Sequence, residues 1–295
     1  MLVLDVGGTY VKYALTDAAG SLLPDTVGQT PSDAQGSYEA FLAVLSRIIA
    51  SAQERQDVGC ACVSIPGPFD FEAGVSRMRH KFPALYGQSL RVPFERAGIG
   101  VSFLHDSTAF MLGEARDGVA QDMASPCCVM LGTGLGFAFM RGGRVCVNAQ
   151  RGPAFSLWNM PYEGGIAEDY VSTRAIQGAY GEALPVKTIA DRARQGDARA
   201  AQAFAGAGFH LSALLGALIP RLGCDGFVLG GQIAKSADLF GLQLDVPWRV
   251  SQHLDDAALR GASAYAQRWR RHSSTTLRMI ATMVTTATEL APSAR

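Results

Sequence analysis

The feature that most constrains the fold is a strand, a glycine turn and a returning strand that occur twice in the chain. The first copy spans residues 2–16 and turns at Gly7-Gly8. The second copy spans residues 127–140, about 125 residues later, and turns at Gly132-Thr133-Gly134. Because a repeated supersecondary unit is typical of duplicated architectures, the sequence predicts two similar lobes, each built on its own hairpin.

Helices and strands follow one another in mixed order around the two hairpins. Apolar periodicity and turn signals predict helices over residues 37–52, 107–115, 167–180 and 198–222, and strands over residues 60–65, 100–104 and 226–229. This order favours an α/β fold, and the antiparallel hairpins distinguish it from a simple Rossmann sheet. We expect an N-terminal lobe over residues 1–107 and a C-terminal lobe over residues 108–295, with the last helices as candidates for packing back on the N-terminal lobe.

Charge and cysteine usage narrow the choice of partners. Lys+Arg and Asp+Glu number 26 each, and a net charge of zero argues against a nucleic-acid partner. No apolar run reaches the length of a membrane span, and residues 211–219 are interpreted as a buried helix.

The six cysteines lie mostly in apolar runs and Met1 leads directly into a strand, so we expect reduced thiols in a cytoplasmic protein. A metal site at Cys60-Ala61-Cys62 is the alternative, but no second pair stands at ligand spacing.

The first hairpin turn has the chemistry of a phosphate-binding loop. Gly7 and Gly8 let backbone N–H groups approach an anion, and Thr9 adds a hydroxyl donor. Asp5 would repel a bare phosphate, but it fits a Mg²⁺ ion held between carboxylate and phosphate, directly or through water. An ordinary hairpin turn is the alternative interpretation.

Two further glycine motifs fit the same ligand. Gly132-Thr133-Gly134 is not part of a Walker loop, because no Gly-Lys-Ser/Thr follows, and a strand rather than a helix comes next. Gly230-Gly231-Gln232 ends a strand and would let a flat ring or a ribose approach the backbone. Taken alone, this motif is better explained by a tight strand-to-helix turn. One phosphate-compatible hairpin in each lobe fits a nucleotide gripped in a cleft between the lobes.

His105-Asp106-Ser107 stands at the end of a predicted strand, before a helix. Reactive groups in α/β proteins often occupy this position. The Asp106 carboxylate could accept a proton from a substrate hydroxyl that attacks phosphorus. Capping of the helix by Asp106 or Ser107 is the alternative interpretation.

Together and in this order, the motifs resemble the ROK family of bacterial sugar kinases and sugar-responsive repressors, within the actin–hexokinase superfamily. The resemblance covers roughly residues 1–268 and rests on residues 4–9 with Lys12, 66–68, 105–107, 132–136, 151–152, 168–172 and 229–233. The resemblance implies a two-lobed actin-like ATPase fold, of the ribonuclease H-like kind. It also implies transfer of the γ-phosphoryl group of Mg-ATP to a sugar hydroxyl, the 6-hydroxyl of a hexose or hexose derivative. Asp106 would be the general base of this reaction. The implied ATP ligands are Asp5, Gly7, Gly8, Thr9, Lys12, Gly132, Thr133, Gly134, Gly230, Gly231 and Gln232. Family members commonly form dimers, so a homodimer is expected.

The sugar half of the resemblance is altered. His105 replaces the family's sugar-contacting Asn, Ser156 replaces a sugar-binding Glu, and Asn159 replaces the His that serves zinc and sugar. The cysteine-rich zinc segment is missing, so no structural zinc is expected. The full set of implied sugar-site residues is Gly67, Lys81, His105, Ser156, Asn159 and Glu168.

Two explanations of this alteration remain open. In the first, the acceptor is an unusual sugar, and the side chains of His80, Lys81 and His105 would suit a more polar or anionic sugar than glucose. Alternatively, the protein is a non-catalytic or sugar-sensing ROK-like binding protein without a DNA-binding domain. Residues 273–295 lie beyond the resemblance and are predicted to be helical.

Overall fold

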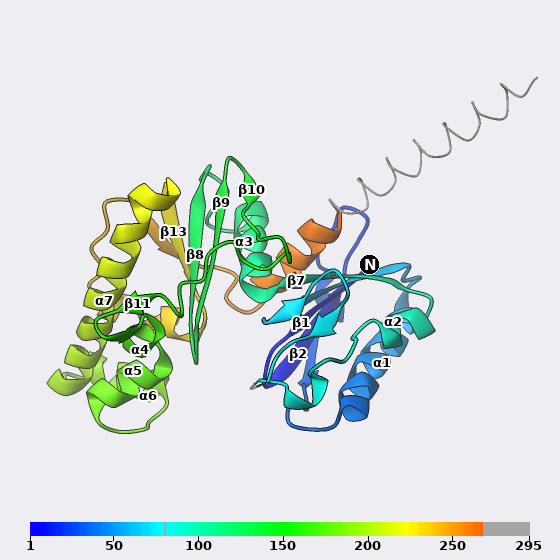
Figure 1. Ribbon diagram of the computed structural model, residues 1–295, viewed down its shortest axis with the longest axis horizontal. Coiled ribbons are helices and arrows are strands. Elements are labelled where there is room, and N and C mark those ends of the chain that lie inside the picture. The colour runs from blue at the N-terminus through cyan, green and yellow to red at the C-terminus, as the bar shows by residue number, and fades with distance from the viewer. Residues whose placement is uncertain (80, 268–295) are drawn as a thin grey trace, which may run out of the picture.

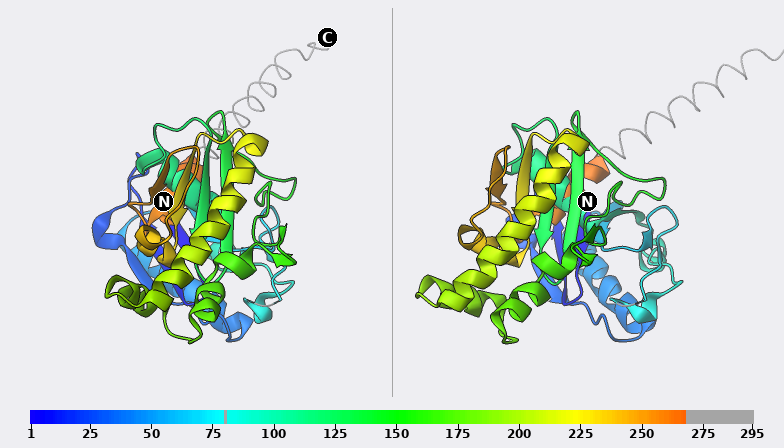
Figure 2. Two further views of the ribbon diagram at one scale, coloured as in Figure 1. Left: turned by 90° about the vertical axis from the view of Figure 1, so that its left-hand side faces the viewer. Right: turned by 60° about the vertical axis from the view of Figure 1, so that its left-hand side comes forward.

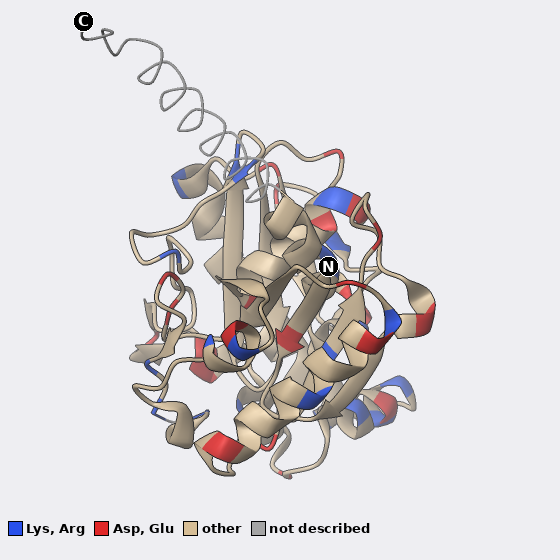
Figure 3. Cartoon of the chain, turned by 90° about the vertical axis from the view of Figure 1, so that its right-hand side faces the viewer, with Lys and Arg blue, Asp and Glu red and all other residues tan. Residues whose placement is uncertain are grey.

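The computed structural model describes residues 1–79 and 81–267, and the predicted helix over residues 273–295 lies outside them. Figure 1 shows two α/β lobes that stand side by side, with the N-terminus in one of them. Acidic and basic residues are interspersed along the chain in the view of Figure 3, in keeping with the net charge of zero.

The N-terminal lobe is built on a five-stranded mixed sheet of order β3-β2-β1-β4-β7. Its strands are β1 (Leu2–Val6), β2 (Tyr10–Leu15), β3 (Gly28–Pro31), β4 (Cys60–Ile65) and β7 (Gly100–His105). β1, β2 and β3 pair antiparallel, whereas β1, β4 and β7 pair parallel. The smaller elements of this lobe are η1 (Pro24–Thr26), α1 (Tyr38–Arg55), β5 (Phe69–Asp70), β6 (Val75–Ser76), η2 (Pro83–Leu85) and α2 (Val92–Arg96).

The C-terminal lobe repeats this topology with the order β10-β9-β8-β13-β14. Its strands are β8 (Pro126–Leu131), β9 (Leu135–Arg141), β10 (Arg144–Val145), β13 (Gly226–Gly230) and β14 (Trp248–Val250). The hairpin strands pair antiparallel and β8, β13 and β14 pair parallel, as in the first lobe. Its other elements are α3 (Asp106–Asp117), β11 (Pro161–Tyr162), β12 (Gly165–Ile166), α4 (Glu168–Val171), α5 (Thr173–Tyr180), α6 (Val186–Arg194), α7 (Ala198–Leu222) and η3 (Gln232–Leu239).

The duplicated hairpin therefore predicted the architecture correctly, and most expected elements occur within a few residues of their predicted bounds. One element differs in kind. The single helix expected over residues 167–180 is two helices, α4 and α5, because Ser172 between them has an extended backbone (φ −92°, ψ 176°). The helix α6 was not predicted from the sequence.

The long helix α7 crosses one face of the second sheet (Figure 2). Its 25 residues have a mean hydropathy of 1.5 over the most apolar stretch, enough by length and composition for a membrane span. Its apolar face, however, includes Phe204, Leu211 and Leu215, which are buried in the core of the lobe. The expected buried helix over residues 211–219 is part of α7, which accounts for its hydropathy as a core helix.

Two segments of the chain join the lobes. The helix α3 follows β7 of the first sheet and packs on the second, where Phe110 and Met111 contact residues of β8 and β9. The chain returns after β14, and helical residues 257–267 pack against Val3, Cys62 and Leu104 of the first sheet. The helix at residues 257–267, drawn in orange in Figure 1, thus lies between the lobes and against α3.

Candidate active site

Two carboxylates lie at the carboxyl edge of the first sheet. Asp5 lies on β1 and Asp106 directly follows β7, and both strands run parallel to β4 between them. Ser64 on β4 donates its hydroxyl to Oδ1 of Asp5 at 2.8 Å. The charge of Asp106 raises the pKa of Asp5, which places the two carboxylates in one electrostatic environment. The sheet thereby brings together two residues that are about 100 positions apart in the sequence.

The pKa of Asp5 rises to about 6. Burial is the largest cause, and the charge of Asp106 adds to it, while the Ser64 hydroxyl and the Lys12 ammonium act in the opposite direction. A carboxylate in this situation gains stability from a nearby cation. Asp5 could therefore serve as a protein ligand of a Mg²⁺ ion, directly or through water, and phosphate and water oxygens would have to complete the shell of that ion.

Replacement of Asp5 by Asn should stabilise the ligand-free protein above about pH 6. In the folded state this carboxyl binds its proton more tightly than at its ordinary value of 3.8. Stability is therefore lost as pH rises from about 4 to about 6, by roughly 1–2 kcal/mol once partial exposure is considered. Asn does not incur this cost. Thermal unfolding at pH 5 and pH 8 without Mg²⁺ measures the effect.

The exposed Asp57→Asn, after α1, serves as the control for the Asp5 substitution. A lower melting temperature for Asp5→Asn than for the wild type at pH 8 contradicts the expectation. With Mg-ATP present, the order should reverse, because the variant lacks the charge that the cation would neutralise.

Asp106 is ionised over the physiological pH range. Burial on its own raises the pKa of Asp106, but the charge and hydrogen bond of His105, the charge of Lys81 and the N–H of Ser107 outweigh it and lower the pKa to about 2. The N–H of Ser107 donates to Oδ1 of Asp106 at 2.6 Å. Asp106 is thus a fixed anion that can accept a proton when a neighbouring hydroxyl loses it.

The start of α3 differs from the expected cap. His105 is the N-cap residue and Asp106 is the first residue of the helix, so capping by Asp106 or Ser107 was a wrong prediction. The His105 ring packs edge-on against Phe71, with centroids 5.9 Å apart. A Cβ on Gly67 would come within 3.2 Å of the same ring. Gly67, a predicted sugar contact, therefore also gives His105 its space.

The first glycine hairpin is open on its outer side. Ser32 holds the carbonyls of Gly8 and Thr9, through its hydroxyl at 2.8 Å and its N–H at 3.0 Å. Gly8 and Thr9 are exposed, and a Cβ on Gly8 would meet no atom within 4 Å. With its carbonyls held by Ser32, the turn offers an open approach to a phosphate.

The second glycine hairpin lies against Glu168. Oε2 of Glu168 accepts the N–H of Leu135 at 2.9 Å and would lie 2.8 Å from a Cβ on Gly134. Thr133 is exposed at the tip of the turn. Glu168, expected at the sugar, is thus bound to the predicted phosphate loop in this structure.

Gly230 and Gly231 are required by packing. A Cβ on Gly230 would lie 2.3 Å from the ring of Phe110, and one on Gly231 would lie 2.3 Å from the carbonyl oxygen of Leu131. Gly231 also has a φ of +81°, which favours glycine. Close packing at the end of β13 therefore explains both glycines, and contact with the nucleotide, with exposed Gln232 beside them, stays a prediction.

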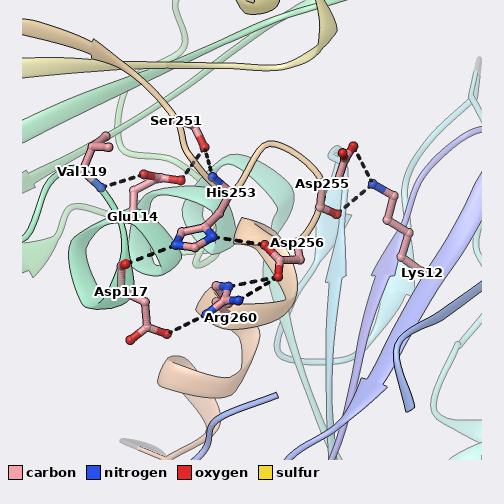
Figure 4. Close-up of polar contacts among 9 residues, drawn as sticks. All are labelled: Lys12, Glu114, Asp117, Val119, Ser251, His253, Asp255, Asp256 and Arg260. Carbon is pink, nitrogen blue, oxygen red and sulfur yellow. Dashed lines mark hydrogen bonds and ion pairs between the residues drawn. The ribbon is translucent and has the colours of Figure 1, made fainter. Parts of the chain in front are cut away.

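Lys12 does not lie at the turn of the hairpin. Its Nζ donates to the carbonyl oxygen of Asp255 at 2.8 Å and lies 3.7 Å from Oδ1 of the same residue (Figure 4). In the register of β1 and β2, Lys12 is opposite Asp5. Lys12 thus connects the first sheet to the segment that returns from the second lobe, and its charge also reaches Asp5.

The remaining predicted sugar-site residues are exposed. Ser156 and Asn159 lie on the loop before β11, and Lys81 lies before η2, where its charge acts on Asp106. The carbonyl of Trp158 accepts the N–H of Glu168 at 3.0 Å, which ties this loop to the second hairpin. Trp158 is 47% exposed and was missed in the sequence, where a lone Trp in a loop carries no signal of its own.

Ser64 and Phe71 were also missed. Both contact predicted site residues, Asp5 and His105, only through the tertiary fold. Among residues 1–79 and 81–267, no group of three or more His, Cys, Asp or Glu side chains is arranged to hold a metal ion. A Mg²⁺ ion would therefore depend on phosphate oxygens for most of its shell.

Comparison with known proteins identifies the family. The model of the ROK family matches residues 1–154 and 161–269. An N-acetyl-D-glucosamine kinase of Pectobacterium atrosepticum is 26% identical over 297 residues, covering 88% of this chain and 96% of that protein.

Solved structures agree in fold. A ROK family glucokinase from Streptomyces griseus, in complex with glucose and AMPPNP, superposes with a TM-score of 0.75 at 20% identity and covers 91% of this chain and 99% of that one. The ROK hexokinase from Thermus thermophilus superposes with a TM-score of 0.72 at 22% identity and covers 92% and 100%. The predicted fold and family are thereby confirmed: the chain belongs to the ROK family.

Proposed function

We propose that this protein is an ATP-dependent sugar kinase that transfers the γ-phosphoryl group of Mg-ATP to a hydroxyl of a hexose or hexose derivative, the 6-hydroxyl being the expected acceptor. The observation that carries the proposal is that the ionised Asp106 and Asp5 lie at the same edge of one sheet, on strands separated by β4. The names of the relatives, which are kinases of glucose and of N-acetyl-D-glucosamine, support the same reaction class.

Asp106 would act as the general base. As the acceptor oxygen bonds to the γ-phosphorus and the bond to the β–γ bridging oxygen breaks, the hydroxyl proton passes to the Asp106 carboxylate and ADP leaves. Because the pKa of Asp106 is about 2, this transfer occurs late, when the hydroxyl has become acidic through bond formation. Bound Mg²⁺ would supply charge neutralisation at the phosphates.

The acceptor site favours a polar or anionic sugar derivative over plain glucose. Lys81 and His105 surround Asp106 with cationic and donor groups, while Ser156 and Asn159 are exposed and short. A site that lacks matched hydrogen bonds binds a hexose more weakly, by about 1–3 kcal/mol of binding free energy for each missing partner. Amino sugars, N-acetyl sugars and sugar acids therefore belong beside hexoses in the test.

The decisive experiment measures ADP release from Mg-ATP over such a panel, with binding of ATP followed in parallel by calorimetry. Turnover that depends on a sugar supports the kinase. Binding of ATP without turnover on any sugar would overturn the proposal in favour of a non-catalytic binding protein, and a sugar that binds without being phosphorylated would identify a sugar sensor.

A further inference from the structure

We infer that His105 is a positioning residue for Asp106, fixing one carboxylate oxygen through its Nδ1–H so that the other faces the acceptor hydroxyl. This role rests on the proposed kinase reaction, in which Asp106 is the base. The imidazole does not take or give the transferred proton in this scheme, and it acts through Asp106.

The geometry places two donors on one oxygen. Nδ1 of His105 lies 2.9 Å from Oδ1 of Asp106, and the N–H of Ser107 donates to the same Oδ1 at 2.6 Å. Neither of these contacts involves Oδ2 of Asp106, so Oδ2 is the oxygen that can face the acceptor hydroxyl. A carboxylate held at one oxygen cannot rotate freely, so its second oxygen has a defined direction.

The hydrogen bonds also determine the tautomer. Oγ of Ser107 lies 2.9 Å from the carbonyl oxygen of Phe137, which can only accept, and 2.9 Å from Nδ1 of His105. Because the hydroxyl has one proton and gives it to the carbonyl, its oxygen accepts from the imidazole. Nδ1 therefore carries a proton, which also suits the carboxylate on its other side.

One weaker contact favours the other tautomer, in which Nδ1 is an acceptor. The N–H of Ser107 lies 3.3 Å from Nδ1, as if the ring were an acceptor. The same N–H has the charged Oδ1 of Asp106 at 2.6 Å, and a hydrogen bond to an anion is the stronger of the two. The Nδ1–H tautomer fits the other two contacts of Nδ1, with its one proton shared between Oγ of Ser107 and Oδ1 of Asp106.

The surroundings hold the ring in this orientation. Phe71 packs edge-on at 5.9 Å, Gly67 leaves space on the side of Nε2 and Cδ2, and the side chain of His105 is 19% exposed. Phe137 lies on β9, the returning strand of the second glycine hairpin. The hydrogen-bonded series Phe137–Ser107–His105–Asp106 thus links the base to the second lobe, whose glycine hairpin is predicted to bind phosphate.

Three side-chain replacements test the role. His105→Asn puts an amide where Nδ1 lies, His105→Gln puts one where Nε2 lies, and His105→Ala removes both. We expect kcat to fall about 10-fold or more in His105→Gln and His105→Ala, and clearly less in His105→Asn, with KM for ATP similar in all three. Equal losses in His105→Asn and His105→Gln, or a wild-type kcat in His105→Ala, would overturn the proposal.

The tautomer can be measured without catalysis. Long-range ¹H–¹⁵N correlation spectra of the full-length protein, assigned through His105→Asn, should show neutral His105 protonated at Nδ1. A ring protonated at Nε2 would refute the inference. If no sugar is phosphorylated, the proposed function fails while this measurement still decides the arrangement of His105 and Asp106.

Discussion

Replacement of Asp106 by Asn should lower kcat for sugar phosphorylation by about 10²- to 10⁴-fold, the usual contribution of a general base. The amide has nearly the shape of the carboxylate and can keep a contact with the N–H of Ser107 through its oxygen. It cannot accept the proton that the attacking hydroxyl must lose. Steady-state ADP release under saturating sugar and Mg-ATP measures the loss.

The binding of ATP separates this effect from misfolding. Asp106→Asn should bind Mg-ATP with an affinity close to that of the wild type, because Asp106 is expected to contact the acceptor rather than the nucleotide. The exposed Asp57→Asn, just after α1, should leave kcat as it is. An Asp106→Asn protein that retains wild-type kcat would refute the role of Asp106 as the base.

Local pattern was sufficient to predict the scaffold of this site. The hairpins at Gly7-Gly8 and Gly132-Thr133-Gly134 are short-range features, since turn chemistry and alternation of apolar residues are written in a few consecutive positions. Each proved to be the centre of a mixed five-stranded sheet. The placement of Asp106 at the end of a strand could be predicted for the same reason.

The partners of the site residues could not be predicted, because they come from distant parts of the chain. Lys12 contacts Asp255, which lies 243 residues away. Glu168 contacts the N–H of Leu135, 33 residues away and on another element. The residues that neighbour Lys12 and Glu168 in the sequence do not indicate these contacts. The resemblance to a family could therefore suggest ligands for Lys12 and Glu168, but not the direction of their side chains.

The helix α3 and helical residues 257–267 cross at two glycines, and this crossing predicts a large effect on stability. A Cβ on Gly261 would lie 1.7 Å from the carbonyl oxygen of Ala109, and one on Gly113 would lie 2.0 Å from that of Ala257. The atoms in the way are backbone, so no side chain can rotate aside. Gly261→Ala must push the two helices apart.

The expected cost of Gly261→Ala is about 3 kcal/mol or more, even after alanine's better helix propensity offsets roughly 1 kcal/mol of it. In a protein of this size that corresponds to a fall in melting temperature of about 6–12 °C. Gly206→Ala is the matched control: Gly206 is exposed on α7 and a Cβ there would meet no atom within 4 Å. It should raise the melting temperature slightly.

The effect of Gly261→Ala should extend to catalysis, because Ala109 lies on the first turn of α3, the helix that begins with Asp106. A displacement of that turn moves the carboxylate relative to β1 and Asp5. We therefore expect kcat to fall at 20 °C, where the variant is still folded by circular dichroism, while Gly206→Ala keeps the wild-type rate. If Gly261→Ala is as stable as Gly206→Ala, the two helices do not cross as closely as the glycines indicate.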